Sequence, residues 1–406
     1  MNKLKIVAII SVIVLSVTSC NNDKDYLSSE DLDQKDPFIE VVDLVRNFEK
    51  TSQTKSGNVY SDSEDIVIDN YEKSTYTLPL ISNIQTKALN VDIPDSASID
   101  LYLVNFHKAG KAGFSIATAD ERIRRIYAYT EEGLISDTLD NPAMSYVIRC
   151  IPEIVVQDLQ KYYNSLGTKA VTSTYVNIGP FLKTRWTQAA PYNNLISLCQ
   201  YSGGQYNGHN AVGCVGTATA QIIAYYRKFQ GTYVGNTNID FDNLTKDPYI
   251  GSSDSRAIQV ARFVREVAIR CAMVWSCDDS DNWGGGTEIS DAYLLLKELG
   301  YSVDLKEHEE INLYRLYQNF QKKNVHLTRG NVKGKKIGHA WVWDGIRGDL
   351  SGTTFNNVLL HCNWGNSSAE NPNVSWGNGW YATYEQPHGQ SNYSENNSQC
   401  YISNYK

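Results

Sequence analysis

The apolar positions near the start of the chain form one run, Ile6–Val17, which follows the basic residues Lys3 and Lys5. The run is shorter than the ~20 apolar residues that a membrane-spanning helix needs, and its layout is that of a secretory signal peptide. No other stretch of the sequence is long and apolar enough to span a membrane. We therefore predict that residues 1–20 direct export and contribute nothing to the fold.

The next segment, residues 21–36, is acidic, polar and nearly free of large apolar side chains. Such a segment buries too little apolar surface to order itself. We expect a flexible tether between the export signal and the first folded domain.

Residues 37–169 mix helical and strand periodicities. Helical spacing of apolar residues over 38–45 is followed by a β-meander pattern over 99–133 and a second helical pattern over 152–166. This mixture predicts an α+β domain. The small and hydroxyl-bearing residues of 167–174 then predict an exposed linker, the kind of segment that proteases cut.

The rest of the chain, residues 170–406, predicts a second α+β domain in which helical signals come first and β-type runs come last. The helical signals lie near 212–229 and 256–271, and the β-type runs lie near 340–346, 357–362 and 379–384.

Composition narrows the possible functions without naming one. The chain has 406 residues, a formal net charge of −8 and 42% hydrophobic residues, so most of it should be globular. The negative charge argues against a general nucleic-acid binder, which usually carries a basic patch. Eight cysteines are too few for a disulfide scaffold of this length.

The strongest candidate for chemistry is Cys214, which lies where a Gly- and Asn-rich loop gives way to a helical pattern. The N-terminus of a helix carries partial positive charge and free N–H groups, which favour a thiolate and can stabilise an oxyanion. A small buried structural cysteine fits the position equally well on these grounds alone.

A thiolate nucleophile needs an imidazole partner, and His339 is the best placed of the seven histidines. It lies at the start of a predicted strand between the small residues Gly338 and Ala340, which leave room for a substrate backbone. His209 is nearer to Cys214 in sequence, but it lies in a polar loop that predicts exposure.

Three further residues complete a candidate site. Asn363 is the candidate for holding the imidazole in one tautomer, and the adjacent Trp364 would shield that hydrogen bond from water. The side-chain amide of Gln188 is a candidate second donor to an oxyanion. Each of these residues has an ordinary structural interpretation when it is taken alone.

Together, these segments resemble the streptopain family of papain-like cysteine peptidases. The resemblance rests on four motifs in order: Trp186-x-Gln188-x-x-Pro191-Tyr192-Asn193; Gly213-Cys214-Val215 with Ala218-Thr219-Ala220-Gln221; Gly338-His339-Ala340-Trp341-Val342-x-Asp344-Gly345; and Asn363-Trp364-Gly365. The segments Gly113–Arg122 and Ile126–Thr130, with Gly133, resemble the inhibitory propeptide of that family.

The resemblance implies a papain-like catalytic domain over 170–406, with a helical lobe and an antiparallel β lobe, preceded by an α+β inhibitory propeptide over 37–169. It implies that Cys214 is the nucleophile, His339 the general base, Asn363 the residue that orients it, Trp364 its cover and Gln188 the oxyanion donor. Protein or peptide substrates, hydrolysis through a thioacyl-enzyme and no metal or organic cofactor are the further expectations.

Two segments depart from the family or invite another interpretation. An insertion, Asn366–Val374, separates Asn363-Trp364-Gly365 from Ser375–Tyr381, so the shape of the cleft on that side is not predicted. The acidic, Gly-rich segment 276–287 lacks the distal Glu of an EF-hand loop, and we expect it to form a wall of the cleft and not a calcium site.

The remaining expectations concern cysteines and location. Val17-Thr18-Ser19-Cys20 resembles a bacterial lipobox, in which Cys20 receives lipid; an ordinary signal peptide with an incidental cysteine is the alternative. Together with the acidic tether, this predicts an outer-membrane lipoprotein at the cell surface, with extracellular release of the mature enzyme left open. The pairing of the six other cysteines is not readable from the sequence.

Three kinds of function thus compete at this point, of which the third is acyl transfer or amide hydrolysis on non-peptide substrates by the same Cys-His pair. The first is a surface-anchored cysteine endopeptidase made as a zymogen. It would be inhibited by its own propeptide, and nucleic acid would not be among its binding partners. The second is a catalytically silent surface inhibitor or adhesin that keeps a peptidase-like fold. The presence of all the matched site residues favours the first class.

Overall fold

The computed structural model describes twelve segments of the chain, and everything below refers to them: residues 36–48, 66–80, 94–130, 132–135, 142–166, 172–229, 239–279, 283–307, 311–331, 338–367, 375–383 and 398–403. Within these segments, no helix is long and apolar enough to cross a membrane. The predicted export signal, the lipobox cysteine Cys20 and almost all of the predicted tether lie outside them.

The N-terminal part of the molecule, which we call the prodomain, is a β-meander with three helices. Its elements are α2 (Pro37–Asn47), β1 (Val67–Pro79), β2 (Ser96–Lys108), β3 (Lys111–Thr118), β4 (Arg125–Thr130), α4 (Pro142–Arg149) and α5 (Ile151–Ser165). The four strands pair in sequence order, each antiparallel to the next. The predicted helix at 38–45, meander at 99–133 and helix at 152–166 are therefore confirmed.

Local sequence explains where the first helix begins. The side chain of Asp36 accepts a hydrogen bond from the N–H of Phe38 (3.0 Å), and Pro37 occupies the first helical position, where a missing N–H costs nothing. Val41, Val42 and Val45 are the buried face of α2. Strand β1 is mostly exposed along its length, which explains why no hydrophobic pattern indicated it.

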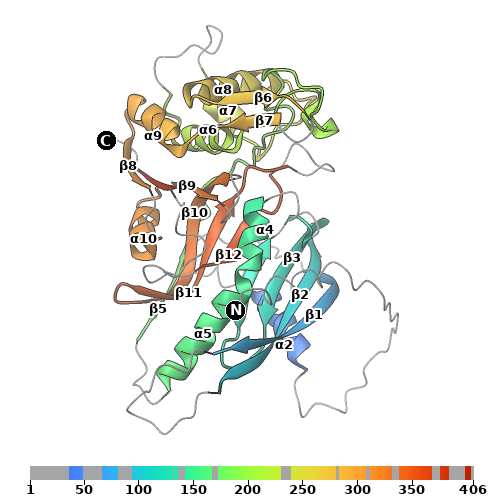
Figure 1. Cartoon of the computed structure of the whole chain (residues 1–406), viewed down its shortest axis with the longest axis vertical. Coiled ribbons are helices and arrows are strands. Elements are labelled where there is room, and N and C mark those ends of the chain that lie inside the picture. Colours follow the sequence, from blue (N-terminus) through green and yellow to red (C-terminus); the bar gives the residue numbers. More distant parts are fainter. Residues whose placement is uncertain are drawn as a thin grey trace.

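The helical lobe of the second domain contains short strands as well as helices. Its elements are the 3₁₀ turn Gly204–Tyr206, α6 (Cys214–Tyr226), α7 (Phe241–Leu244), α8 (Ala257–Arg270), β6 (Val274–Cys277), β7 (Trp283–Gly286) and α9 (Ile289–Glu298). Residues 215–224 of α6 are all buried, so this helix is the centre of the lobe. Figure 1 shows the lobe at the end of the molecule farthest from the prodomain.

The β lobe lies between the helical lobe and the prodomain (Figure 1). Its elements are β5 (Thr174–Ile178), β8 (Ser302–Glu307), α10 (Leu313–Gln321), β9 (His326–Asn331), β10 (Gly338–Ser351), β11 (Thr354–Asn363), β12 (Gly379–Ala382) and β13 (Ser398–Ser403). The strand pairs are antiparallel throughout. The α+β class, with a helical lobe and an antiparallel β lobe, is confirmed; the limits 37–169 and 170–406 stay predictions.

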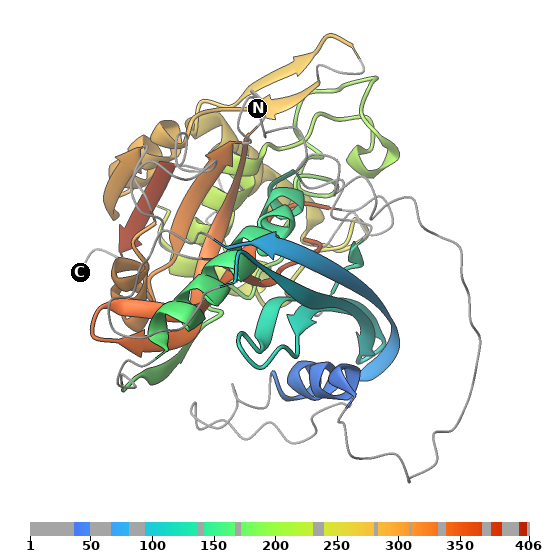
Figure 2. The same ribbon diagram turned by 60° about the horizontal axis from the view of Figure 1, so that its bottom comes forward.

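The prodomain and the β lobe share one sheet. Strand β4 pairs with β12, with Thr130, Tyr129 and Ala128 opposite Gly379, Trp380 and Tyr381. The strand order is β1-β2-β3-β4-β12-β11-β10-β9-β13-β8, with β5 on β10. Figure 2 shows the prodomain strands and α5 alongside the β lobe.

Two hydrophobic cores lie on opposite faces of β10. Ala340 and Val342 belong to the core shared with the helical lobe, whereas Trp341 and Trp343 belong to the core shared with the prodomain. This alternation follows from the two-residue period of a strand. Strand β10 therefore packs against the helical lobe on one face and against the prodomain on the other, and His339 lies at its N-terminal end.

Candidate active site

Cys214 is the first residue of α6, as the sequence predicts, and Gly213 precedes it with φ +97°. A Cβ at position 213 would lie 1.8 Å from the Cε atom of Met273 and 3.1 Å from the carbonyl oxygen of Gly285. The backbone conformation therefore requires glycine before Cys214, and the overlap with the end of the Met273 side chain adds to the cost of any other residue. The N–H of Thr217 donates to the carbonyl of Gly213 (3.0 Å) and closes the first helical turn.

The loop that leads to Cys214 is held against the β6–β7 hairpin. The indole N–H of Trp275 donates to the carbonyl of Ala211 (3.0 Å), and the N–H of Gly284 donates to Oδ1 of Asn210 (3.0 Å). The Gly-rich segment thus borders the nucleophile loop. Among the residues that the structure describes, no group of three or more His, Cys, Asp or Glu side chains is placed to hold a metal ion.

A disulfide between Cys199 and Cys277 ties the same loop to the hairpin. Sequence reasoning left this pairing open. Cys150 and Cys214 are half-buried free thiols, and Cys271 and Cys362 are buried free thiols.

His339 is the second residue of β10 and its side chain contacts Cys214. Nε2 of the ring donates to the main-chain carbonyl of Trp364 (2.8 Å). This bond places the proton on Nε2 in the neutral ring, which leaves Nδ1 to take the proton of the thiol. His339 is only 6% exposed, so the pair is largely shielded from water.

The electrostatics of the pair favour a thiolate and an imidazolium. Burial raises the pKa of Cys214, but the contact with His339 and the N–H groups of Ala340 and Val215 outweigh it, so the pKa lies below the ordinary value for a thiol. Burial lowers the pKa of His339, but the contacts with Cys214 and the carbonyl of Trp364 outweigh it, so the pKa lies above the ordinary value.

Asn363 makes its hydrogen bonds with Thr184 and Gln221, whereas sequence reasoning expected one to the imidazole. Its Nδ2 donates to the carbonyl of Thr184 (2.7 Å), and its Oδ1 accepts from Nε2 of Gln221 (3.1 Å). Oε1 of Gln221 accepts from the N–H of Trp186 (3.1 Å). Both amides are thus engaged in joining the start of the domain to α6, and the next residue along supplies the acceptor for His339.

Trp364 was expected to shield a hydrogen bond between Asn363 and His339 from water, and the structure shows other contacts for its side chain. Its ring is buried and packs against Trp341 with centroids 5.1 Å apart, and its indole N–H donates to the carbonyl of Gly377 (3.1 Å). Because the bond to His339 comes from the main chain of Trp364, the indole has no Asn–His bond to shield.

Gln188 lies next to the nucleophile loop. Its carbonyl accepts from the N–H of Val212 (3.0 Å), two residues before Cys214, and its side chain is half-buried. This position is compatible with an oxyanion donor, and the role itself stays a prediction.

Sequence reasoning did not predict that the segment after the insertion holds Trp364; we call this segment the 375–378 loop (Ser375, Trp376, Gly377 and Asn378). Oδ1 of Asn378 accepts from the main-chain N–H of Trp364 (2.8 Å) and from the hydroxyl of Ser375 (2.8 Å). The only sequence signal was the insertion that carries this loop away from Asn363, and it gave no indication that the chain returns to Trp364.

Part of the chain is similar to a known peptidase family. Residues 186–372 match the model of the Peptidase C10 family. A search of the curated proteins found no match. Among solved structures, a fragment of prointerpain A from Prevotella intermedia is similar, with 18% identity, a TM-score of 0.49, and coverage of 80% of this chain and 98% of that one.

Proposed function

Because residues 186–372 match the model of the Peptidase C10 family, we propose that this chain is the zymogen of a cysteine endopeptidase. The observation that carries the proposal is the contact between Cys214 at the N-terminus of α6 and His339 on β10, with opposite pKa shifts of the two groups. A lowered thiol pKa and a raised imidazole pKa keep the nucleophile and its acid charged together near neutral pH.

The proposed reaction uses this pair in two steps. The Cys214 thiolate attacks the carbonyl carbon of a peptide bond, and the oxyanion is stabilised by the N–H of Cys214 and the amide of Gln188. The imidazolium of His339 gives its proton to the departing amine, which leaves a thioester on Cys214. The neutral imidazole then removes a proton from water, hydroxide attacks the thioester, and the acid departs as the thiolate and imidazolium re-form.

The contacts of the prodomain support its role as an intramolecular inhibitor. The N–H of Gly377 donates to the carbonyl of Glu132 (3.0 Å), and the Glu132 carboxylate pairs with Arg185. Met144 of α4 packs directly against Gly377, where a Cβ would lie 2.4 Å from its sulfur. The prodomain thus contacts the 375–378 loop, which in turn holds Trp364 beside the catalytic pair.

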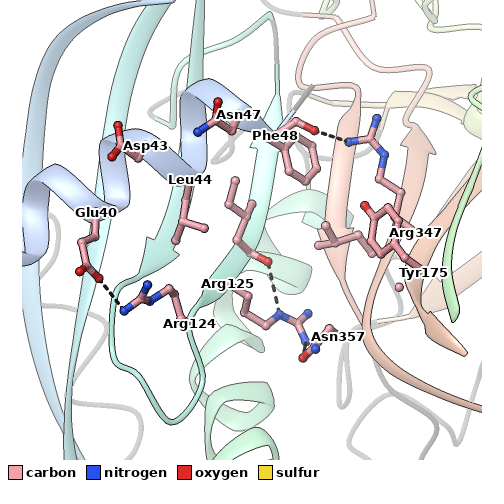
Figure 3. Close-up of a pocket in the computed structure, with 13 residues that line it drawn as sticks. Glu40, Asp43, Leu44, Asn47, Phe48, Arg124, Arg125, Tyr175, Arg347 and Asn357 are labelled. Carbon is pink, nitrogen blue, oxygen red and sulfur yellow. Dashed lines mark hydrogen bonds and ion pairs between the residues drawn. The ribbon is translucent and has the colours of Figure 1, made fainter. Parts of the chain in front are cut away.

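A second set of contacts lies farther from the catalytic pair. Arg125 of the prodomain donates to the carbonyl of Val358 (3.1 Å), and Arg347 of β10 lies over the ring of Phe48, 4.4 Å from its centroid. These side chains border a cavity of about 470 Å³ between the two domains (Figure 3). None of the candidate catalytic residues lines this cavity, so we assign it to domain attachment.

The decisive experiment compares the full chain with its Cys214→Ala variant. We expect the variant to lose casein hydrolysis and self-processing together, by about 10⁴-fold or more in kcat. A peptidyl epoxide should label the parent protein at Cys214, as located by mass spectrometry. Hydrolysis that survives in the variant would refute the assignment, and a folded parent protein without hydrolysis or labelling would favour the silent inhibitor or adhesin.

We also propose that Cys20 is lipidated and that the protein is held on the outer membrane at the cell surface, with the lipobox-like sequence 17–20 as the support. Metabolic labelling with a fatty acid should mark the parent protein and not the Cys20→Ser variant. Protease treatment of intact cells should degrade the parent protein if the protein lies on the outer face of the outer membrane. N-terminal sequencing of the mature form would show whether cleavage frees the enzyme from its anchor.

A further inference from the structure

The carbonyl of Trp364 is the group that holds the ring of His339, so the direction of this carbonyl matters for catalysis. A main-chain carbonyl is positioned by whatever fixes its residue. For Trp364, both the main-chain N–H and the indole N–H are bound by the 375–378 loop, at Asn378 and Gly377 respectively.

Asn378 is itself held in place. Only 7% of it is exposed, and its Oδ1 receives the hydroxyl of Ser375, which is fully buried, as well as the N–H of Trp364. The neighbouring carbonyl of Gly377 accepts from the indole of Trp364 (3.1 Å) and from the hydroxyl of Tyr381 (2.5 Å). The loop therefore binds Trp364 through two acceptor oxygens, and each of these oxygens also accepts a second hydrogen bond that fixes its position.

From this chain of contacts we propose that Asn378 is a positioning residue for His339, which it orients through the main chain of Trp364. The proposal deepens the proposed function and rests on it. Asn378 touches neither His339 nor Cys214 through a hydrogen bond among the described contacts; it sets the direction of the bond that the imidazole makes. Sequence reasoning expected Asn363 to have this role, but the side chain of Asn363 binds Gln221 and Thr184 instead.

The test uses the full chain with Asn378→Ala and Asn378→Asp. Alanine removes the acceptor, so the imidazole loses a fixed partner; we expect kcat to fall ~10- to 100-fold with KM within about twofold. Aspartate keeps an oxygen that accepts both hydrogen bonds, and it should restore kcat to within ~10-fold of the parent. The matched control is Asn177→Ala, which removes an amide oxygen that accepts from Arg347 (2.9 Å) in the same lobe; its kcat should not change.

A second measurement separates positioning from general loss of structure. The rate of Cys214 alkylation by iodoacetamide across pH reports the thiolate–imidazolium pair without peptide hydrolysis. Because the Trp364 carbonyl contributes to the raised pKa of His339, the pH above which the pair breaks down should move downward in Asn378→Ala and return toward the parent value in Asn378→Asp.

The outcomes distinguish the two claims. A parent protein that is alkylated but cleaves no peptide refutes the proposed function, and the alkylation profiles still decide the role of Asn378. Parent-like profiles and kcat in Asn378→Ala refute the positioning role. If that variant fails to fold, Ser375→Ala, which frees the Asn378 amide, should lower kcat about 3- to 10-fold, and an unchanged kcat there refutes the proposal.

Discussion

The two candidate catalytic residues are held by different means. Cys214 owes its place to the backbone: it begins a buried helix, and the residue before it is a glycine confined between Met273 and Gly285. His339 begins a strand, and its ring is directed by a hydrogen bond to Trp364. That acceptor is in turn fixed by a loop that residues 365–374 separate from Trp364 in sequence.

This difference decides how each residue responds to change. A nucleophile set by local backbone geometry is disturbed by substitutions that alter that backbone or fill its space. An imidazole set by a series of hydrogen bonds is disturbed by substitutions several contacts away. The predictions below test each half of this contrast, from the largest expected effect to the smallest.

Replacement of His339 by alanine should have the largest effect, because the general base and the charge partner of the thiolate are lost together. We expect kcat/KM to fall by about 10⁴-fold. The pKa of Cys214 should rise, since the contact with His339 is the main influence that opposes burial. The pH dependence of iodoacetamide alkylation measures this rise.

The control is His209→Ala, which removes the other imidazole that lies near Cys214 in sequence. Nδ1 of His209 pairs with the carbonyl of Ile196 (2.7 Å) and so has a structural partner. Its replacement should leave kcat/KM within a few-fold. An equally severe loss in this variant would contradict the assignment of the base.

Replacement of Gly213 by alanine tests the backbone half of the contrast. The new Cβ would overlap Met273, and alanine is strained at φ +97°, so we expect a loss of about 2–4 kcal/mol of stability. The displaced Cys214 should also be alkylated more slowly. Thermal unfolding and alkylation of the same samples measure both effects.

Two comparisons make this prediction specific. Adding Met273→Ala should relieve the overlap but not the strained φ, so recovery should be partial. Gly203→Ala places a Cβ where no heavy atom lies within 4 Å, and it should change neither property. Full stability and normal alkylation in Gly213→Ala would show that the backbone there does not constrain the nucleophile.

The same contrast explains how much could be predicted from sequence. The positions of Cys214 at the start of a helix and of His339 at the start of a strand could be predicted, because both kinds of boundary leave local signals in residue type and periodicity. The α2 helix and the β2–β4 meander were found for the same reason. Strand β1 was missed because it pairs along one edge only and its side chains are mostly exposed.

Asn363 shows where sequence reasoning fails. The residue type and its place near the end of a strand were suitable for orienting an imidazole. Its actual partners, Thr184 and Gln221, come from segments 179 and 142 residues away in sequence. Which atom faces the histidine depends on how those segments pack, and no local pattern records that.

A second buried histidine provides the next test. His326 lies on β9 opposite Trp343 of β10, and neither of its ring nitrogens has a hydrogen-bond partner among the described residues. Burial, aided by Arg315, lowers the pKa of His326 to about 3, whereas the partners of His339 raise the pKa of that ring. A buried imidazole without hydrogen-bond partners thus stays neutral, whereas the partners of His339 favour its cationic form.

His326 should therefore make stability depend on pH. Its folded-state pKa lies below the unfolded value of 6.5, so the unfolded chain takes up the proton first. The stability contribution is complete above pH 6.5 and is lost as the pH falls toward 3, at up to about 1.4 kcal/mol per pH unit. Phenylalanine at this position should remove that slope, since no ring hydrogen bond is lost.

Urea unfolding of the Cys214→Ala zymogen, with and without His326→Phe, measures the difference between pH 7 and pH 4. The inactive background prevents self-digestion, and the carboxylates that titrate in this range are common to both proteins. Equal slopes in the two proteins would mean that His326 is not kept neutral in the folded state.

The smallest effect is expected for Trp364→Phe, which separates the side chain of Trp364 from its main chain. Phenylalanine loses the indole hydrogen bond to Gly377 but keeps the carbonyl that receives His339. We expect a loss of about 1–2 kcal/mol of stability and a kcat within about fivefold of the parent. Thermal unfolding and steady-state hydrolysis measure the two.

The opposite result for Trp364→Phe would change our account of how His339 is held. A large fall in kcat with little loss of stability would mean that the indole directs the histidine, and the main chain would then be incidental. The 375–378 loop binds Trp364 at both its indole and its main-chain N–H. Trp364→Phe removes the first of these contacts and Asn378→Ala removes the second. If the main chain transmits the position of the loop, Asn378→Ala must cost more activity than Trp364→Phe.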